Sequence, residues 1–214
     1  MSKSTTQPAA DRAYDYVKGR IISGNYPDTT MLSEGEVAGS LGLSRTPVRE
    51  AFLRLEVEGF LKLYPKRGAL VLSLSDRDIR EIFEARQLVE TKCASNVCAF
   101  PDEDRAVVVQ ELRELLARQE EALAGLDLAT FSEADAAFHH TVFRHAGNRI
   151  LESLGASLRE HQQRFTAITL RRSMDNSKRF MASHRALVDA LEAGDAAAYA
   201  RVLEEHLHDA QGMG

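Results

Sequence analysis

Long apolar runs and cysteines are scarce in this sequence of 214 residues. It contains no stretch of about 18 apolar residues, so we expect no membrane-spanning helix. The N-terminal segment MSKSTTQPAADR is polar and lacks the apolar core of a signal peptide. The only two cysteines, Cys93 and Cys98, match no metal or redox spacing. Two such thiols fit a reducing compartment, so we expect a cytoplasmic protein.

Charge is unevenly distributed along the chain. The formal net charge of −5 at first argues against a nucleic-acid partner. However, residues 1–74 carry 10 Lys and Arg against 8 Asp and Glu, whereas residues 75–214 carry 17 against 24. The first part is therefore the positive one. Because its excess is small, nucleic-acid binding would need two copies of it or well-placed arginines.

The segment Leu32–Val71 begins with the pattern of two short helices joined by a tight turn. Ser33 lies three residues before Glu36, which fits a capping box at the start of the first helix. Gly42 supplies the backbone freedom that a turn between closely packed helices needs. Ser44 is placed to cap the second helix.

The second helix of this pair has an apolar face and a polar face. Its apolar positions recur at helical spacing and are Val48, Ala51, Phe52 and Leu55. Arg45, Thr46 and Arg49 fall on the opposite side, near the N-terminal end of the helix. Side chains at such positions reach base edges and phosphates when a helix enters a DNA groove. Arginine suits both targets, because its planar fork binds guanine or phosphate through two hydrogen bonds.

A short hairpin follows, with strands predicted at residues 60–64 and 69–72. The turn between them is Pro65-Lys66-Arg67-Gly68, and such a basic tip can lie against a DNA backbone or enter a minor groove. Two helices and a hairpin also occur as a small α+β domain with no role in DNA binding. The agreement of spacing, outward arginines and basic tip favours DNA binding over that alternative.

The remaining sequence is almost entirely helical in pattern. A helix around residues 14–21 opens the chain, and Ser75 is placed to cap another that runs from Asp76 to about Phe100. Five further helices are predicted at residues 102–124, 128–146, 148–170, 177–193 and 195–211, with breaks at Gly125, Gly147, around Asp175 and at Gly194. We therefore predict a mainly α protein. A winged helix-turn-helix domain would span residues 1–74, and an antiparallel bundle of about six helices would span residues 75–214.

One carboxylate and three imidazoles point into the core of the predicted bundle. Asp135 lies on the apolar stripe of its helix, and His139 follows one turn later. His184 and His206 lie on the stripes of the last two helices. A buried carboxylate without a partner is costly, and a divalent cation would neutralise it. Three histidines and one aspartate suit zinc, nickel or manganese, with positions left for water or a ligand.

Other interpretations of these histidines stay open. A single inward histidine is more often a hydrogen-bonded core residue than a metal ligand. His161 fits either a pocket or the core, and His145 is suited to compensating a helix dipole. A metal held here would serve ligand binding, the chemistry of a metal-dependent enzyme of the hydrolase or oxygenase type, or structure alone.

The first domain resembles the winged helix-turn-helix of the GntR family of bacterial transcription regulators. The motifs that carry the resemblance are Leu32-Ser33-Glu34, Ser44 to Ala51, Glu58-Gly59-Phe60 and Arg67-Gly68. The resemblance implies contacts to operator bases or phosphates from Arg45 and Arg49, backbone contacts from Ser44 and Thr46, and a wing tip formed by Arg67 and Gly68. Some members carry an arginine where this chain has Gly35, so we expect part of the operator to be read differently.

The second domain resembles the C-terminal FCD effector domain of FadR-type GntR regulators, and about six helices fit its shorter, VanR-like branch. In that domain a subset of members binds a divalent metal through one aspartate and three histidines. The positions that match are Asp135, His139, His184 and His206. The resemblance thus implies the ligand set that the apolar stripes also indicate, with zinc as the expected metal.

Arg86 matches an arginine that commonly projects into the effector pocket of this family. The effectors of the family are often small organic or sugar acids, which a guanidinium would bind. The alternative is a salt bridge between Arg86 and Glu90, four residues later. Together these resemblances imply a homodimeric repressor that binds a palindromic DNA operator and responds to a small acid, rather than an enzyme.

Overall fold

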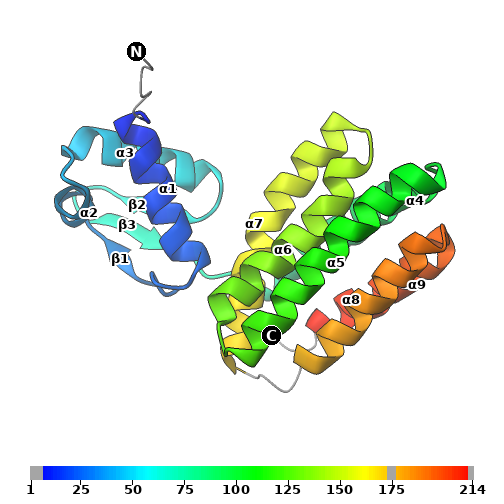
Figure 1. Ribbon diagram of the computed structural model, residues 1–214. Coiled ribbons are helices and arrows are strands. Elements are labelled where there is room, and N and C mark those ends of the chain that lie inside the picture. Colours follow the sequence, from blue (N-terminus) through cyan, green and yellow to red (C-terminus); the bar gives the residue numbers. More distant parts are fainter. Residues whose placement is uncertain (1–6, 173–176, 212–214) are drawn as a thin grey trace, which may run out of the picture. The chain divides into compact units, whose positions relative to one another are not determined.

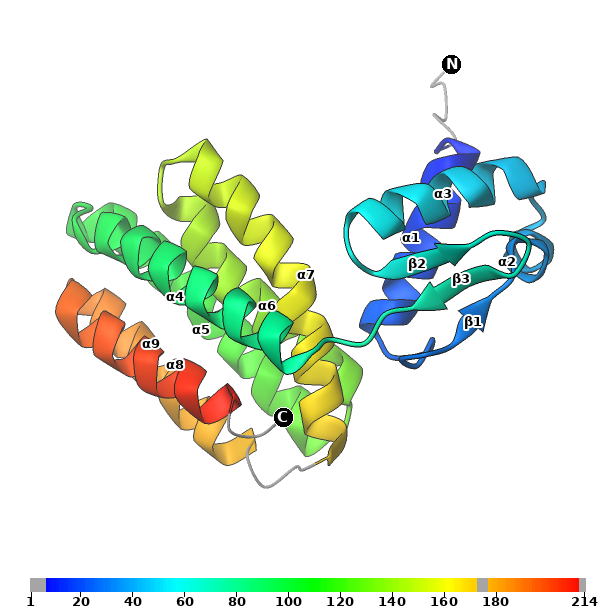
Figure 2. The ribbon, with the colours of Figure 1, turned by 180° about the vertical axis from the view of Figure 1, so that it is seen from behind.

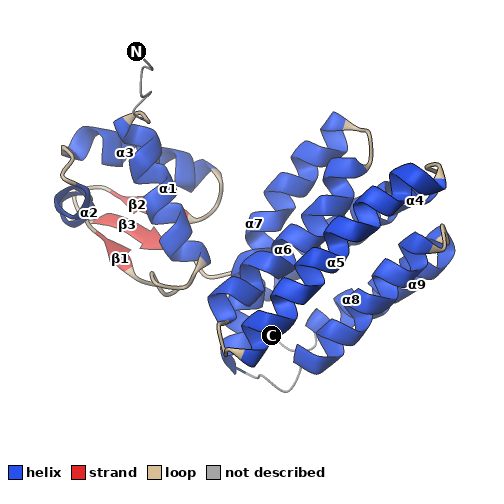
Figure 3. Cartoon of the chain, viewed as in Figure 1, coloured by secondary structure: helices blue, strands red, loops and turns tan. Residues whose placement is uncertain are grey.

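The computed structural model describes residues 7–172 and 177–211. The chain forms two compact units, one ending at Ser73 and the other beginning at Leu74 (Figure 1). Helices make up most of both units, and the strands of the described residues all lie in the first (Figure 3). The prediction of a mainly α protein is therefore confirmed.

The first unit combines three helices with a small sheet. Its strands are antiparallel and lie in the order β1-β3-β2, so β3 is central. The elements are α1 (Ala9–Ile22), β1 (Met31–Leu32), α2 (Glu34–Leu41), α3 (Arg45–Val57), β2 (Leu61–Tyr64) and β3 (Gly68–Val71). The sequence predicted all of these except β1, which has only two residues and therefore no alternating pattern to reveal it.

The turn between α2 and α3 is tight as predicted, but the capping differs. Gly42 takes a positive φ of 63° at the end of α2. Ser33 caps α2 by accepting a hydrogen bond from the backbone N–H of Gly35 at 3.2 Å, not from that of Glu36 as a capping box requires. Ser44 holds the N-cap position of α3, yet its side chain makes no capping hydrogen bond. The expectation that Ser44 caps through its side chain was wrong, and the exposed hydroxyl is left for other partners.

The apolar face of α3 forms the centre of the core of the first unit. The predicted stripe is completely buried and consists of Val48, Ala51, Phe52 and Leu55. It packs mainly against α1, where Val17 and Ile21 are also buried. Burial of each large side chain stabilises the unit by roughly 1.5–3 kcal/mol. This packing fixes the rotation of α3 and thereby turns its polar face outward.

The hairpin of β2 and β3 closes where Tyr64 pairs with Gly68. Gly68 has a φ of 108°, a conformation that other residues rarely adopt. A Cβ at this position would lie 2.2 Å from the carbonyl oxygen of Leu32, because β1 passes alongside. The glycine of the hairpin tip is therefore required by backbone conformation and by space.

The second unit is a bundle with six helices in its described part. They are α4 (Asp76–Cys98), α5 (Asp102–Ala124), α6 (Leu128–His145), α7 (Arg149–Arg172), α8 (Ser177–Glu192) and α9 (Ala196–Gln211). These bounds agree with the predicted ones to within two residues at each end. The predicted break around Asp175 lies outside the described residues. Ser75 caps α4 as expected, in a full capping box with Asp78.

The helices of the bundle enclose one apolar core. α6 packs against both α5 and α7, while α8 contacts α5 and α9 contacts α4 (Figures 1 and 2). α4 also packs against α6, so α4, α6, α8 and α9 all face the same interior. Among the helices that the structure describes, none has both the length and the apolarity needed to cross a membrane.

Candidate functional site

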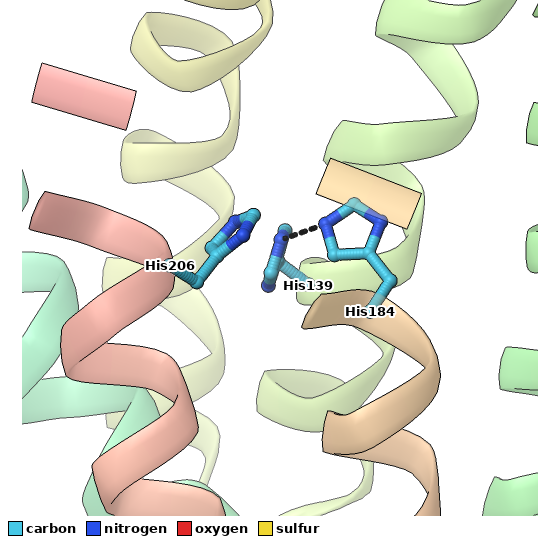
Figure 4. Close-up of side chains that lie close together, drawn as sticks. All are labelled: His139, His184 and His206. Atoms are coloured by element: carbon cyan, nitrogen blue, oxygen red, sulfur yellow. Dashed lines mark hydrogen bonds between the residues drawn. The ribbon is translucent and has the colours of Figure 1, made fainter. Parts of the chain in front are cut away.

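Four side chains meet in the interior of the bundle and form what we call the Asp–His cluster: Asp135, His139, His184 and His206. One nitrogen from each of the three imidazoles lies within 4.8 Å of the others (Figure 4). The Nε2 atoms of His139 and His184 are 3.2 Å apart. Asp135 Oδ1 lies 3.4 Å from Nε2 of His184 and 3.9 Å from Nε2 of His139. The structure thus brings together all four residues that the sequence pointed to.

Helical spacing and aromatic packing position the cluster. Asp135 and His139 are one turn apart on α6, so they share a face. Phe138 stacks on His184, with ring centroids 4.7 Å apart, and meets His139 edge-on. His206 on α9 lies edge-on to Phe180. All four cluster residues are buried, and His139 and His184 have no exposed surface.

Burial lowers the pKa of all three imidazoles below the ordinary value, to about 4 for His184. The charge of Arg86 lowers the pKa of His139 further, and the other two histidines do the same for His206. Neutral imidazole, with a free lone pair, is the form that binds metal. At neutral pH the cluster therefore offers neutral imidazole nitrogens to a common centre, beside the side-chain oxygens of Asp135, and this donor set suits zinc and related divalent ions.

Glu90 on α4 is completely buried beside the cluster and is hydrogen-bonded through both oxygens. Its Oε1 lies 2.7 Å from Nδ1 of His139 and accepts a 2.8 Å hydrogen bond from the hydroxyl of Tyr199. Its Oε2 accepts a 3.0 Å bond from Nε of Arg86. Burial raises the pKa of Glu90, while the charge of Arg86 and the bonds from Tyr199 and Arg86 oppose that rise.

Arg86 makes the salt bridge to Glu90 that one interpretation of the sequence predicted, and it also lines a cavity. The cavity measures about 10 Å³, room for about one water molecule. Asp135 and His206 line it as well, together with the ring of Phe83. Among the described residues, Nη2 of Arg86 has no hydrogen-bond partner although it is buried. An unpaired buried donor of this kind favours an anion or water beside it.

The other histidines stand outside the cluster. His145, in the last turn of α6, places Nε2 3.0 Å from Oε2 of Glu111, so a contact with a carboxyl group accompanies its position at the helix end. His140 and His161 are half-buried, and His208 is exposed. None of these belongs to the group of three imidazoles that converge.

The predicted DNA-contact residues lie on one exposed face of the first unit. The start of α3 and the hairpin tip border a groove of about 490 Å³. Of the six predicted positions, Ser44 and Thr46 are exposed beside this groove and four line it: Arg45, Arg49, Arg67 and Gly68. This arrangement gives a polar, basic surface around the end of a helix, as groove reading requires.

Two contacts within the groove were not predicted from the sequence. Glu34 pairs with Arg49, with Oε1 2.9 Å from Nε. Gly35 lies under Arg45, because a Cβ there would be 3.3 Å from Nη2 of that arginine. These pairs are 15 and 10 residues apart in the sequence, and no helical or strand spacing links them.

The sequence also missed the outer partners of the histidines. Oε1 of Gln119 lies 2.7 Å from Nδ1 of His184, and Oγ of Ser183 lies 2.8 Å from Nδ1 of His206. Gln119 did have a signal, because it occupies the buried stripe of α5 at helical spacing after Leu112. A polar residue at such a position predicts a buried hydrogen bond.

Comparison with protein families gives two matches on this chain. The model of "Bacterial regulatory proteins, gntR family" matches residues 9–71. The model of the FCD domain matches residues 81–209. The first match covers the unit with the basic groove, and the second covers the bundle with the Asp–His cluster.

Individual proteins are similar over most of the chain. An HTH-type transcriptional regulator in an unstable DNA locus of Streptomyces ambofaciens is 35% identical over 176 residues, covering 82% of this chain and 72% of that protein. The gluconate operon transcriptional repressor of Bacillus subtilis is 27% identical over 203 residues, 93% of this chain and 82% of the repressor. A solved transcriptional regulator GntR from Rhodococcus sp. RHA1 has a TM-score of 0.78 at 25% identity, over 95% of each chain.

Proposed function

Because this chain belongs to the GntR family of bacterial regulatory proteins and carries an FCD domain, we propose that it is a repressor whose operator binding responds to a small carboxylate bound at a metal-containing pocket. The family and the relatives are transcription regulators, so the chain is a DNA-binding regulator and not an enzyme. It would act in the cytoplasm, where its DNA target lies.

We assign DNA binding to residues 1–74. Arg45 and Arg49 would contact operator bases or phosphates, Ser44 and Thr46 would contact the DNA backbone, and Arg67 with Gly68 would form the wing tip. The exposure of these residues around one groove supports the assignment. Because this part carries only two excess positive charges, we propose that a homodimer places two copies on the half-sites of a palindrome.

We assign dimerisation and effector binding to residues 75–214. Asp135, His139, His184 and His206 would hold the metal, and FCD domains are commonly metal-binding. The donor set fits a divalent cation, because a carboxylate oxygen and two imidazole nitrogens lie within 3.9 Å of each other in a buried space. Zinc is the metal we expect, with nickel and manganese as competitors.

A small organic or sugar acid is the effector class that we propose. The observation that carries this proposal is the unpaired Nη2 of buried Arg86, a residue that lines the same cavity as Asp135 and His206. Because the cavity has room for about one water molecule, the helices around it would move apart to admit the acid. A metal bound here would supply a Lewis-acidic position for a carboxylate oxygen, and Arg86 would bind another oxygen of the ligand. A repressor of a gluconate operon among the relatives fits this class.

The structural change caused by ligand binding would be transmitted to the DNA-binding domain through α4. This helix carries Arg86 and Glu90, and its N-cap residue, Ser75, lies two residues after Ser73, where the first unit ends. We propose that the acid changes helix packing near Ser75, alters the spacing of the two recognition helices and releases the operator. Such coupling requires the acid to bind one arrangement better than the other.

A gel shift with the DNA upstream of its own gene tests the regulatory function. The zinc-loaded chain should bind this DNA, and gluconate or a related small acid should weaken binding, whereas neutral sugars should not. Binding that stays unchanged with every acid would contradict the effector assignment. If neither the zinc-loaded nor the metal-free chain binds this DNA, the proposal that the operator lies upstream of its own gene is contradicted.

Metal analysis and thermal shift separate an effector role of the metal from a purely structural role. If the metal holds the acid, chelation should abolish the acid-induced rise in melting temperature. A metal that only stiffens the bundle would behave differently, since chelation would lower the melting temperature but leave the acid-induced shift intact.

A further inference from the structure

Each histidine of the Asp–His cluster has its Nδ1 atom occupied by a partner outside the cluster. The partner is Glu90 for His139, Gln119 for His184 and Ser183 for His206. The three partners come from three helices, α4, α5 and α8. If each is a hydrogen-bond acceptor, every Nδ1 carries the proton and every Nε2 carries a lone pair.

Ser183 accepts from His206, because its only proton is committed elsewhere. Its hydroxyl donates to the backbone carbonyl oxygen of Phe180 at 2.9 Å. The remaining interaction, 2.8 Å to Nδ1 of His206, therefore places a lone pair of the hydroxyl oxygen against the ring. Nδ1 of His206 must supply the proton, so its Nε2 is unprotonated in the neutral ring.

Gln119 accepts from His184 for a similar reason. Its amide nitrogen lies 3.5 Å from the carbonyl oxygen of Ala134 and donates toward it. That orientation turns the carbonyl oxygen Oε1 toward Nδ1 of His184, at 2.7 Å. Nδ1 of His184 is then the donor, and its Nε2 faces the centre of the cluster.

Glu90 is the strongest of the three acceptors. A carboxylate accepts hydrogen bonds through both oxygens, and Glu90 already receives them from Tyr199 and Arg86. Its 2.7 Å contact with Nδ1 of His139 completes this arrangement. A carboxylate behind a metal-binding histidine orients the ring and makes its other nitrogen more basic.

Asp135 is held in the same manner. Its Oδ2 accepts hydrogen bonds from Nε2 of Gln162 at 2.9 Å and from the hydroxyl of Thr166 at 3.1 Å. Oδ1 is left to face Nε2 of His184 and of His139. Each of the four cluster residues therefore uses one polar atom for a hydrogen bond to a residue outside the cluster, and its other polar atom faces the centre of the cluster.

We infer that Glu90, Gln119 and Ser183 are positioning residues that fix the Nδ1–H tautomer of all three histidines, so that Nε2 is the metal donor of each ring. The inference rests on the proposed metal centre. In this arrangement two Nε2 lone pairs face each other at 3.2 Å beside a carboxylate oxygen. Such a group is repulsive by itself and attractive around a cation, which makes the cluster a prearranged site.

Zinc affinity tests the role of the outer partners in the full chain. Competition with a chromophoric chelator should show that Glu90→Gln weakens zinc binding by about 10- to 100-fold, the usual effect of losing such a partner. Gln119→Met and Ser183→Ala remove neutral acceptors, so their losses should be smaller. Glu111→Gln is the matched control, because it alters a carboxylate–histidine pair outside the cluster and should leave zinc affinity unchanged. Wild-type affinity in Glu90→Gln would overturn the inference.

Nitrogen-15 NMR of the histidine rings reads the tautomers without any substitution. The wild-type chain, both metal-free and zinc-loaded, should show three cluster rings with protonated Nδ1, and zinc should shift their Nε2 signals by far more than their Nδ1 signals. A cluster ring whose Nδ1 lacks the proton, or whose Nδ1 signal takes the larger zinc-induced shift, would overturn the inference. If wild-type protein binds no zinc, the proposed metal centre fails, and the tautomers of the metal-free sample decide this inference separately. Should Glu90→Gln not fold, these spectra and the Ser183→Ala affinity provide the decision.

Discussion

The two units of the chain hold their functional side chains under opposite conditions. In the first unit, Arg45, Arg49 and Arg67 are exposed around an open groove. In the second, the Asp–His cluster is buried and each member is hydrogen-bonded outward. Water solvates an exposed cation until DNA replaces it, so little prearrangement is needed. A buried polar group cannot be solvated by water, so the fold itself must supply its hydrogen-bond partners.

The largest expected effect is the removal of a buried ligand. His184→Ala should weaken zinc binding on the order of 100-fold or more, since zinc sites of proteins gain roughly 10–16 kcal/mol from about four ligands. Operator binding by the exposed arginines of the metal-free chain should persist. Chelator competition and a gel shift on the same preparation measure both. His145→Ala, a substitution outside the cluster, is the control and should keep wild-type zinc affinity.

Gly68→Ala should have the next largest effect, and it tests how strongly the first unit depends on the backbone conformation of the hairpin tip. The added methyl group would meet the carbonyl oxygen of Leu32, and φ is unfavourable, so we expect a loss of about 3 kcal/mol in unfolding free energy. Gly42→Ala is the matched control, because its φ is also positive but no atom lies within 4 Å of the added Cβ. It should cost only about 1 kcal/mol. Denaturant unfolding of the two full-length variants compares them, and equal losses would contradict the role given to the Leu32 contact.

Arg45→Ala and Arg49→Ala test the role of the exposed arginines in the first unit. Each should weaken operator binding by roughly 1–3 kcal/mol, or about 5- to 150-fold, while leaving zinc affinity unchanged. Fluorescence anisotropy with labelled operator measures the change. Lys92→Ala removes an exposed cation from the bundle and serves as the control. Unaltered operator affinity in both arginine variants would remove the basis for groove reading by α3.

Glu34→Gln should have a smaller effect and the opposite sign. Glu34 pairs with Arg49 inside the groove, so it competes with DNA phosphates for that arginine. Neutralising it should raise operator affinity a few-fold, an effect of about 0.5–1 kcal/mol that salt diminishes. Titrations at two ionic strengths would show this. Weaker operator binding by Glu34→Gln would mean that Glu34 orients Arg49 for DNA binding rather than competing with DNA for it.

The smallest expected effect is a pH dependence at the start of α4. The side-chain and backbone hydrogen bonds with Ser75 lower the pKa of Asp78 below its ordinary value. Because the folded pKa is depressed, this stabilisation is present above the ordinary pKa and is lost as the pH falls through the folded pKa. Asp78→Asn should therefore reduce unfolding free energy slightly at pH 7, and the difference from wild type should vanish in acid. Asp78 is exposed, so solvent screening keeps the effect small.

Much of the fold followed from helical periodicity. The period of 3.6 residues placed Val48 and Phe52 on the buried face of α3 and turned Arg45 outward. The same period put Asp135 and His206 on inward faces, which is why the cluster was accessible to sequence reasoning. Each of these inferences concerns a single helix and its own faces.

The features that sequence reasoning missed depend on contacts between elements. Gln119 meets His184 because α5 packs against α8, and that registry is set by the whole core. Glu34 meets Arg49 across the turn between α2 and α3. Ser44 had the right identity for a cap, yet its hydroxyl is not used in that way. Pairing of this kind depends on three-dimensional distance, which the spacing along one helix does not encode.

The contact between Gly68 and Leu32 has a consequence for engineering. The hairpin tip is seated on the backbone that enters α2 through Gly68, and Lys66 within the tip also takes a positive φ of 62°. Residues 65–67 are exposed and precede that contact. We therefore expect that tip sequences can be exchanged while the scaffold of the first unit is retained, provided that they keep Gly68 and carry a residue that tolerates positive φ, such as Gly or Asn, at position 66.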